Sequence, residues 1–315
     1  MKTKEPLKYL LDQTFTLLES RGKQENPNIG INTGYIDLDK LLGGFQKSTL
    51  NIIASRPGMG KSAFIETMML NMAIQNNLKV LFFSIEASED MLMQRFLSNR
   101  SNIQLREIQQ GKLTQEQWQH IDKTSKELLN AKIYIDTTPS IDIDDLCQLV
   151  RSNCIDNSID VVFIDFMQLI TTTNTRTISN REQEIGYIAR VLKGLSKELN
   201  LPIFVTSQLN RRYTEKGIEN WRDPVLADLR DSGTLEDVAD SVLFIHRPDV
   251  FGITVDEDGM PLNGLANIII AKNRHGSTDT IRFRFKKEFC LFECLIDDLE
   301  TFTVAREFGE NKSPF

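Results

Sequence analysis

The chain has 315 residues, of which 40% are apolar and 26% are charged, and its formal net charge is −7. This composition is ordinary for a globular protein and is sufficient for one large α/β domain with an accessory element. The acidic balance excludes a protein coated in basic surface, but it leaves room for nucleic-acid binding through a few basic residues gathered in one place.

Residues 6 to 20 predict a single amphipathic helix. Apolar side chains recur there at helical spacing and form one stripe, consisting of Leu7, Leu10, Leu11, Phe15 and Leu18. A lone helix cannot bury such a stripe, so we expect it to dock on this chain or on a neighbour. The polar segment that follows, RGKQENPN (21–28), contains glycine and proline and is interpreted as a flexible tether.

From Ile31 onward, short apolar runs alternate with helical stretches. The runs with the composition of buried strands are LNIIAS (50–55), VLFFSI (80–85), KIYI (132–135), VVFID (161–165), PIFVTS (202–207) and SVLFI (241–245). Their alternation with helices predicts a mostly parallel sheet. The later runs NIIIAK, IRFRF and LFEC are joined by short turns and predict an antiparallel finish. The acidic and polar tail after Leu299 gives no strong prediction.

The strongest chemical signal follows the first of these runs. The residues Ser55, Arg56, Pro57, Gly58, Met59, Gly60, Lys61 and Ser62, followed by Ala63, fit a phosphate-binding loop with serine in place of its first glycine. Glycines let backbone N–H groups surround phosphate oxygens, and the following helix points its positive end at them. Lys61 would then reach the β- and γ-phosphates of ATP, and the Ser62 hydroxyl would ligate Mg²⁺. The alternative is a tight strand–helix turn without a ligand.

Polar side chains at the ends of three other runs complete a candidate site. Asp165 ends VVFID and is predicted to hold Mg²⁺ beside Ser62, the alternative being a helix cap or loop carboxylate. Glu86 follows VLFFSI and is placed to orient or deprotonate an attacking water, unless it is a solvent-facing loop residue. Gln208 follows PIFVTS, where its amide could sense the γ-phosphate and report its loss to the loop 209–213, although polar residues at strand ends are commonly structural.

Cysteine spacing and the start of the chain indicate the compartment. The cysteines form no CxxC pair and have no histidine at ligand spacing, so we expect reduced thiols at Cys147, Cys154, Cys290 and Cys294. The start lacks the apolar core of a signal peptide, and no apolar run reaches the length of a membrane span. The sequence therefore predicts a soluble cytoplasmic protein.

The order and spelling of these pieces resemble the C-terminal motor domain of bacterial replicative helicases of the DnaB type. The matching stretches cover nearly everything from Ile31 to about Phe292, in the family's order; they are TGYIDLDKLLGGF, ASRPGMGKSAF, VLFFSIEAS with MLMQR, VVFIDFMQLI, LSKELNLPIFVTSQLNRR, DLRDSGTLEDVADSVLFIHR and AKNRHG. The resemblance implies a RecA-like phosphate-loop ATPase core that uses ATP and Mg²⁺. It also implies a hexameric ring that translocates on single-stranded DNA, 5′ to 3′, and unwinds the duplex in replication.

The resemblance also implies roles for individual residues. Lys61, Ser62 and Asp165 become the nucleotide and Mg²⁺ residues, Glu86 the base and Gln208 the γ-phosphate sensor. Lys272 and Arg274 match a pair that reaches the neighbouring subunit's ATP. In the family, one loop lines the central channel of the ring and holds the backbone of single-stranded DNA. The residues that match this loop are Arg230, Asp231, Ser232 and Gly233. The implied organisation is a linker helix on the neighbouring subunit (1–22), a tether (23–30), the ATPase domain (31–300) and a tail (301–315).

Three features depart from the family's pattern. Ser55 replaces a Gly or Ala, Asp231 stands where many members have Glu, and the N-terminal collar domain that meets primase is missing. The chain is therefore either a shortened form or a naturally short relative, phage-borne or plasmid-borne, and primase binding is not carried over. Two other functions stay open: a RecA-like ATPase of recombination, repair or regulation without processive unwinding, and a ring or loading partner without turnover.

Overall fold

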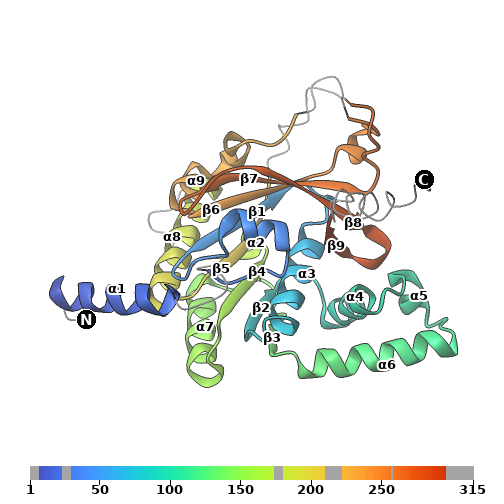
Figure 1. Cartoon of the computed structure of the whole chain (residues 1–315), viewed down its shortest axis with the longest axis horizontal. Coiled ribbons are helices and arrows are strands. Elements are labelled where there is room, and N and C mark those ends of the chain that lie inside the picture. Colours follow the sequence, from blue (N-terminus) through green and yellow to red (C-terminus); the bar gives the residue numbers. More distant parts are fainter. Residues whose placement is uncertain (1–6, 23–29, 174–179, 210–221, 257, 296–315) are drawn as a thin grey trace, which may run out of the picture.

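The computed structural model describes residues 7–22, 30–173, 180–209, 222–256 and 258–295. Within these residues the chain forms one nine-stranded sheet with helices on both faces (Figure 1). The strand order is β3-β2-β4-β5-β1-β6-β7-β8-β9. The predicted α/β class is confirmed.

The strands are β1 (Leu50–Ser55), β2 (Val80–Ser84), β3 (Ile133–Asp136), β4 (Val161–Asp165), β5 (Ile203–Gln208), β6 (Ser241–His246), β7 (Leu265–Asn273), β8 (Thr280–Lys286) and β9 (Leu291–Cys294). The α-helices are α1 (Leu7–Gly22), α2 (Ile36–Leu42), α3 (Lys61–Ile74), α4 (Glu89–Ser101), α5 (Leu105–Gln110), α6 (Gln115–Asn130), α7 (Ile143–Asn157), α8 (Arg181–Leu199) and α9 (Gly233–Val238). Short 3₁₀ helices are η1 (Met167–Leu169), η4 (Leu226–Ser232), η5 (Pro248–Phe251) and η6 (Lys287–Phe289).

Strands β1 to β6 form the parallel part of the sheet, as predicted. Every residue of β1, β2, β4 and β6 is buried, because helices cover both faces and the strands are mostly apolar. Strand β3 lies at the edge of the sheet and is only half-buried. The run predicted at 202–207 lies one residue later, so Gln208 is the last residue of β5.

Strands β7, β8 and β9 add the predicted antiparallel finish. Side chains of β7 alternate between buried and half-buried along most of its length, as expected where one face of a strand packs on the core and the other is more exposed. Because β7 runs antiparallel to β6, with Ser241 opposite Asn273, the end of β7 lies at the edge where the parallel strands begin.

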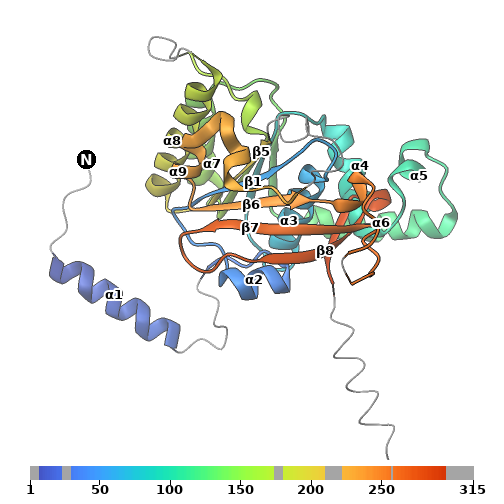
Figure 2. The same cartoon turned by 90° about the horizontal axis from the view of Figure 1, so that it is seen from above.

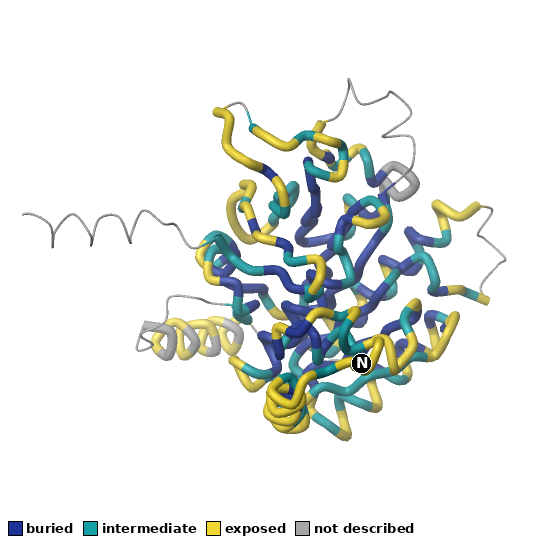
Figure 3. The backbone as a smooth tube through the Cα atoms, turned by 90° about the vertical axis from the view of Figure 1, so that its right-hand side faces the viewer, coloured by how far each residue is buried: buried dark blue, intermediate teal, exposed yellow. Residues whose placement is uncertain are grey.

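Two hydrophobic cores lie on opposite faces of the sheet. One packs α7, α8 and α9 against the strands, and the other packs α2, α3 and α4. Figure 2 shows α8 and α9 on one side of the sheet and α2 on the other. In Figure 3 the buried residues concentrate along the central strands. Helix α3 is rich in methionine, and Met68, Met69 and Met72 are fully buried in the second of these cores.

Helix α1 lies away from this body (Figure 2) and exposes its apolar stripe, including Leu7, Phe15 and Leu18. It spans 16 residues, and it begins one residue later and ends two residues later than predicted. The proposed tether lies almost wholly, and the tail entirely, outside the described residues. None of the helices in the described ranges combines the length and the apolar character needed to span a bilayer.

Candidate functional site

The loop between β1 and α3 has the backbone of a phosphate cradle. Gly58 and Gly60 adopt φ values of 79° and 92°, in the left-handed region that glycine enters most readily. A Cβ on Gly60 would also lie 3.0 Å from the Phe292 ring and 3.1 Å from the Phe285 ring. The second glycine therefore serves both the turn and the close approach of the C-terminal strands.

Helix α3 begins directly after this loop, with Gly60 at its N-cap. No side chain among the described residues caps this end, and its first turn contains no acidic residue. The first N–H groups of a helix have no partner within it, and the helix dipole makes this end positive. The end of α3 can therefore accept an anion such as a phosphate group.

The carboxyl ends of four neighbouring parallel strands bring the predicted residues together. Ser55 pairs in register with Gln208, and Ser84 pairs with Asp165. Glu86 comes two residues after Ser84, so it lies at the same edge of the sheet. Ligands of open α/β sheets bind at this edge.

A cavity of about 450 Å³ opens at that edge. From the predicted set it is lined by Ser55, Arg56, Pro57, Gly58, Gly60, Lys61, Ser62, Ala63, Glu86 and Gln208. The Met59 side chain is instead buried in the core, and Asp165 is buried without being among the lining residues. The cavity is of the size typical of small-molecule sites.

Lys61 lies between the acidic residues of this site. Burial lowers the pKa of its ammonium group, while the charges of Asp165 and then Glu86 oppose that shift. Its Nζ lies 4.6 Å from the centre of the Phe166 ring. The partly desolvated ammonium group can bind an anion in the cavity, whereas the two neighbouring carboxylates repel that anion unless a cation accompanies it.

Asp165 is held by its neighbour on β5. Its Oδ1 accepts a hydrogen bond from the Thr206 hydroxyl. Across the described part of the chain, no group of three or more His, Cys, Asp or Glu side chains could hold a metal ion unaided. Asp165 and the Ser62 hydroxyl offer two hard oxygen donors. These can hold a metal ion only where a bound ligand and water supply its other coordinating oxygens.

An arginine–glutamate pair beside the cavity was not predicted. Arg95 of α4 lines the cavity and its Nη1 lies 3.0 Å from Oε1 of Glu66, a buried residue of α3. Burial raises the pKa of Glu66 to about 7, although the charge of Arg95 opposes this shift. In the sequence, Arg95 is the last residue of the stretch MLMQR, and nothing there shows that it lines a cavity. Its partner Glu66 lies in a helix that otherwise has the composition of a core element.

The C-terminal strands supply further lining residues that sequence reasoning missed, namely Phe285, Lys287 and Cys290. Leu105 and Phe166 line the cavity as well. Phe285, Lys287 and Cys290 come from β8 and from the turn that contains η6, more than two hundred residues after the phosphate loop. No local spacing connects them to the loop.

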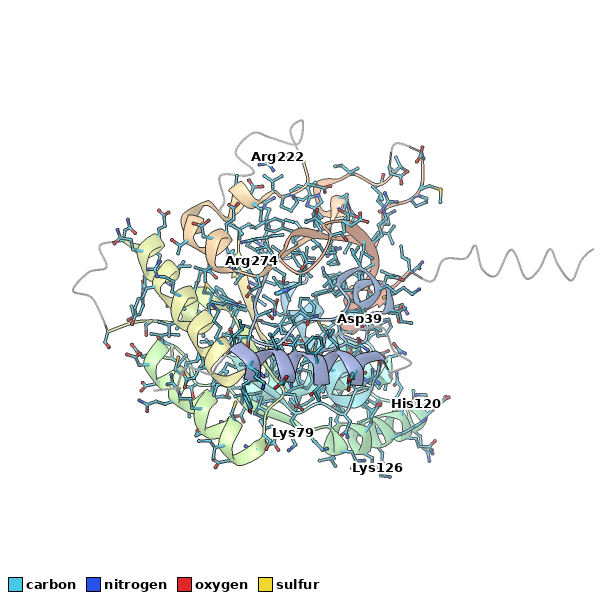
Figure 4. The ribbon with its side chains drawn as sticks, turned by 60° about the vertical axis from the view of Figure 1, so that its left-hand side comes forward. Asp39, Lys79, His120, Lys126, Arg222 and Arg274 are labelled. Carbon is cyan, nitrogen blue, oxygen red and sulfur yellow. The ribbon has the colours of Figure 1, made fainter. Side chains whose placement is uncertain are left out.

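Lys272 and Arg274 lie elsewhere. The Arg274 guanidinium donates to the Asp237 carbonyl and lies 3.6 Å from Asp240, while the Lys272 ammonium donates to the Glu236 carbonyl. Figure 4 labels Arg274, which follows β7 at the edge where the parallel strands begin. Strand β1 has six residues and separates the two edges by roughly 20 Å at about 3.3 Å per residue. Neither side chain lines the cavity of its own chain.

The predicted channel residues form the end of η4 and the start of α9. The backbone turns as a 3₁₀ helix from Leu226 to Ser232 with a kink at Leu229, and α9 follows from Gly233. The side chains of Arg230, Asp231 and Ser232 lie outside the described part of the structure, as do residues 210–213 of the loop after Gln208.

Known proteins are similar to this chain in sequence and fold. The family model described as "DnaB-like helicase C terminal domain" matches residues 30–294. The replicative DNA helicase DnaB of Geobacillus stearothermophilus is 36% identical over 286 residues, which cover 91% of this chain and 61% of that protein. A solved structure described as an ATPase domain superposes with a TM-score of 0.82 at 26% identity, covering 93% of this chain and 100% of that one. A second structure, of a DnaB-like replicative helicase and its interactions with primase, has a TM-score of 0.78 at 26% identity, covering 93% and 68%.

Proposed function

Because the chain belongs to the family of the DnaB-like helicase C-terminal domain, we propose that it is the ATP-hydrolysing motor of a ring-forming DNA helicase. The chain spans about 60% of the length of the curated relatives it matches, and those relatives are named replicative DNA helicases. In this proposal residues 31–300 form the motor, 1–22 a linker helix, 23–30 a tether and 301–315 a tail.

One observation supports ATP hydrolysis above the others: the phosphate loop, Lys61, Glu86 and Gln208 line a single cavity. Backbone N–H groups of the loop and the start of α3 would bind the phosphates, with Lys61 against the β- and γ-phosphates. Glu86 is an exposed carboxylate at the cavity wall, where it would orient the attacking water and accept its proton. Gln208 would contact the γ-phosphate.

The donor set fits a magnesium ion. Mg²⁺ keeps several waters and is bound through one or two carboxylates plus substrate phosphates, and Ser62 with Asp165 provides a hydroxyl and one carboxylate. The ion would neutralise charge on the β- and γ-phosphates. The hydrogen bond from Thr206 fixes the orientation of the Asp165 carboxylate.

The proposed active site is shared between subunits. Arg274 lies at the far edge of its own sheet, so it can serve only the cavity of a neighbour. A planar guanidinium suits the charge that spreads over a transferring phosphoryl group, and such arginines commonly contribute about 10³-fold or more in rate. Lys272 would accompany it. The exposed apolar stripe of α1 supports docking on the adjacent subunit, which would help to close a ring.

Single-stranded DNA is the proposed track. Residues 230–233 would hold its phosphates through backbone N–H groups and Arg230, which makes binding independent of base sequence. This mode needs no basic exterior, in agreement with the net charge of −7.

The central experiment measures the ATPase rate with and without single-stranded DNA, together with native mass and strand displacement on a forked substrate. We expect a hexameric mass, DNA-stimulated hydrolysis and unwinding. The Lys61→Ala variant should lose hydrolysis, whereas Lys126→Ala on the exposed face of α6 (Figure 4) is the matched control and should keep it. Full activity in Lys61→Ala would refute the assignment. Stimulated hydrolysis without unwinding would instead favour a RecA-like ATPase of recombination or repair.

Mixed rings test the shared site. Arg274→Ala subunits keep a sound cavity without the arginine, and Lys61→Ala subunits keep the arginine without a working cavity. Each variant alone should be nearly inactive, and partial hydrolysis should return in the mixture once subunit exchange is demonstrated. A fully active Arg274→Ala ring would end this assignment.

A further inference from the structure

Gln168 joins the two strands that carry the metal-site aspartate and the γ-phosphate sensor. It lies in η1, three residues after Asp165. Its Nε2 donates to the Ser207 hydroxyl at 2.9 Å, and its Oε1 accepts from the Gln208 N–H at 3.3 Å. Both ends of one amide group therefore hold the last two residues of β5.

This contact lies where the backbone pairing of the sheet stops. The β4–β5 ladder pairs Val162 with Ile203, Phe163 with Phe204 and Ile164 with Val205, and goes no further. Beyond that point side chains replace the ladder, through the Thr206–Asp165 hydrogen bond and the Gln168 amide. The end of β5 stays paired with β1, and it is joined to β4 through these side-chain contacts.

Gln168 also connects to the helix that packs on the proposed DNA segment. Its backbone carbonyl accepts a hydrogen bond from the guanidinium of Arg181, the first residue of α8. Helix α8 contacts η1, η4 and α9. At Gly186 the approach is so close that a Cβ would lie 2.9 Å from the side chain of Thr234, next to residues 230–233.

From these contacts we propose that Gln168 is a positioning residue that couples the γ-phosphate sensor Gln208 to the DNA segment 230–233 through Arg181 and α8. The inference rests on the proposed function. Gln168 holds the backbone N–H of the sensor itself, so a shift of Gln208 toward the γ-phosphate displaces η1. The displacement then passes to Arg181 and, through rigid helix packing, to η4 and α9.

Coupling of this kind is reciprocal: nucleotide state changes DNA affinity by the same factor as DNA changes nucleotide affinity. The test measures the affinity of the whole chain for a fluorescent oligothymidylate with Mg²⁺ and either a non-hydrolysable ATP analogue or ADP. The ratio of the two dissociation constants is the coupling. In the wild-type protein we expect a ratio within the usual range of about 5- to 150-fold.

Gln168→Met keeps the length of the side chain and removes both hydrogen bonds. It should bring the ratio close to one while changing the affinity for a fluorescent ATP analogue, without DNA, by less than about 3-fold, because the phosphate loop is untouched. The exposed Gln119 of α6 provides the matched control, and Gln119→Met should keep the wild-type ratio. If Gln168 only supported the fold, its substitution would lower the DNA affinity equally with the ATP analogue and with ADP, and the ratio of the two dissociation constants would stay unchanged.

Arg181→Met interrupts the next contact and gives a second, independent variant should Gln168→Met fold poorly. It should also lower the ratio, and the double variant should be no lower than the worse single variant, because the two residues act in series. A wild-type ratio well above one that persists in Gln168→Met, or in Arg181→Met, overturns this inference alone. A wild-type ratio of one overturns the proposed function and the inference with it.

Discussion

The surroundings of Glu66 predict how strongly the stability of the protein depends on pH. It is a buried glutamate of α3 whose carboxylate contacts Arg95 at 3.0 Å beside the cavity. Burial raises its pKa from 4.5 to about 7, because a charged carboxylate is poorly solvated there even with an arginine beside it. The Glu66→Gln substitution keeps the size and the hydrogen-bond acceptor but removes the ionisation.

A raised pKa makes stability fall as pH rises. Between pH 4.5 and 7 the unfolded chain releases the Glu66 proton while the folded protein retains it, so the folded state becomes relatively less favourable. The contribution is fully present below pH 4.5 and is lost as pH passes 7. Integrated between about pH 5 and about pH 7.5, the loss is about 2 kcal/mol. Glu66→Gln lacks this contribution, so its stability relative to wild type should rise by that amount over the interval.

Urea unfolding at a series of pH values measures the difference. The lost ionic partner of Arg95 adds a constant offset, since arginine stays charged throughout, and only the change in the difference with pH matters. Glu127→Gln is the matched control, because Glu127 also pairs with an arginine, at 2.9 Å, but its side chain is 38% exposed. Unfolding free energies of Glu66→Gln and wild type that stay parallel from about pH 5 to about pH 7.5 would refute the reasoning from burial.

Four further substitutions, one of them a matched control, test the candidate site and the fold around it. Gly60→Ala should lower the melting temperature and abolish nucleotide binding, because the new Cβ meets two phenylalanine rings at 3.0–3.1 Å in a backbone with φ of 92°. Gly58→Ala meets nothing within 4 Å among the described residues and should unfold at a higher temperature than Gly60→Ala, so the reverse order in calorimetry would contradict the steric argument. Arg95→Met should weaken nucleotide binding at least several-fold in a fluorescence titration if the guanidinium faces the phosphates, and an unchanged affinity would limit the Arg95 side chain to packing. Asp240→Asn should lower the free energy of unfolding in urea by about 3 kcal/mol, because the half-buried Lys193 ammonium loses the carboxylate that lies 2.6 Å from it in the wild-type protein. A loss below about 1 kcal/mol would mean that water replaces the ion pair.

The parallel core could be predicted because each of its strands is a short, mostly apolar run. Helices cover both faces of β1 and β4, so their sequences are mostly buried apolar residues, and the predicted bounds match the structure. Strand order could not be predicted, since the neighbours of β1 are β5 and β6, more than 140 residues further along the chain. The pairing of Ser55 with Gln208 depends on that order.

The candidate site divides in the same way. The loop 55–63, Glu86 and Gln208 could be predicted because each lies at or just after the end of a strand that is visible in the sequence. Phe285 and Lys287 could not, because they reach the cavity through the antiparallel hairpins. Arg95 escaped notice because a single basic residue on a helix is usually solvent-exposed, and only its contact with the buried Glu66 distinguishes it.

The positions of Arg274 and the cavity restrict how subunits can assemble around a shared site. Strand β1 begins at Leu50, whose N–H bonds the same Asp240 that lies beside Arg274, and it ends at Ser55, where the phosphate loop starts. A two-fold dimer pairs one surface patch with itself, so such a dimer would have to place both edges of each sheet, roughly 20 Å apart, in a single interface. A head-to-tail contact brings the arginine edge of one subunit to the cavity edge of the next. Such contacts use two different surfaces and satisfy every cavity only when the series closes on itself. A head-to-tail ring is therefore the assembly that we propose for a shared site built from these residues.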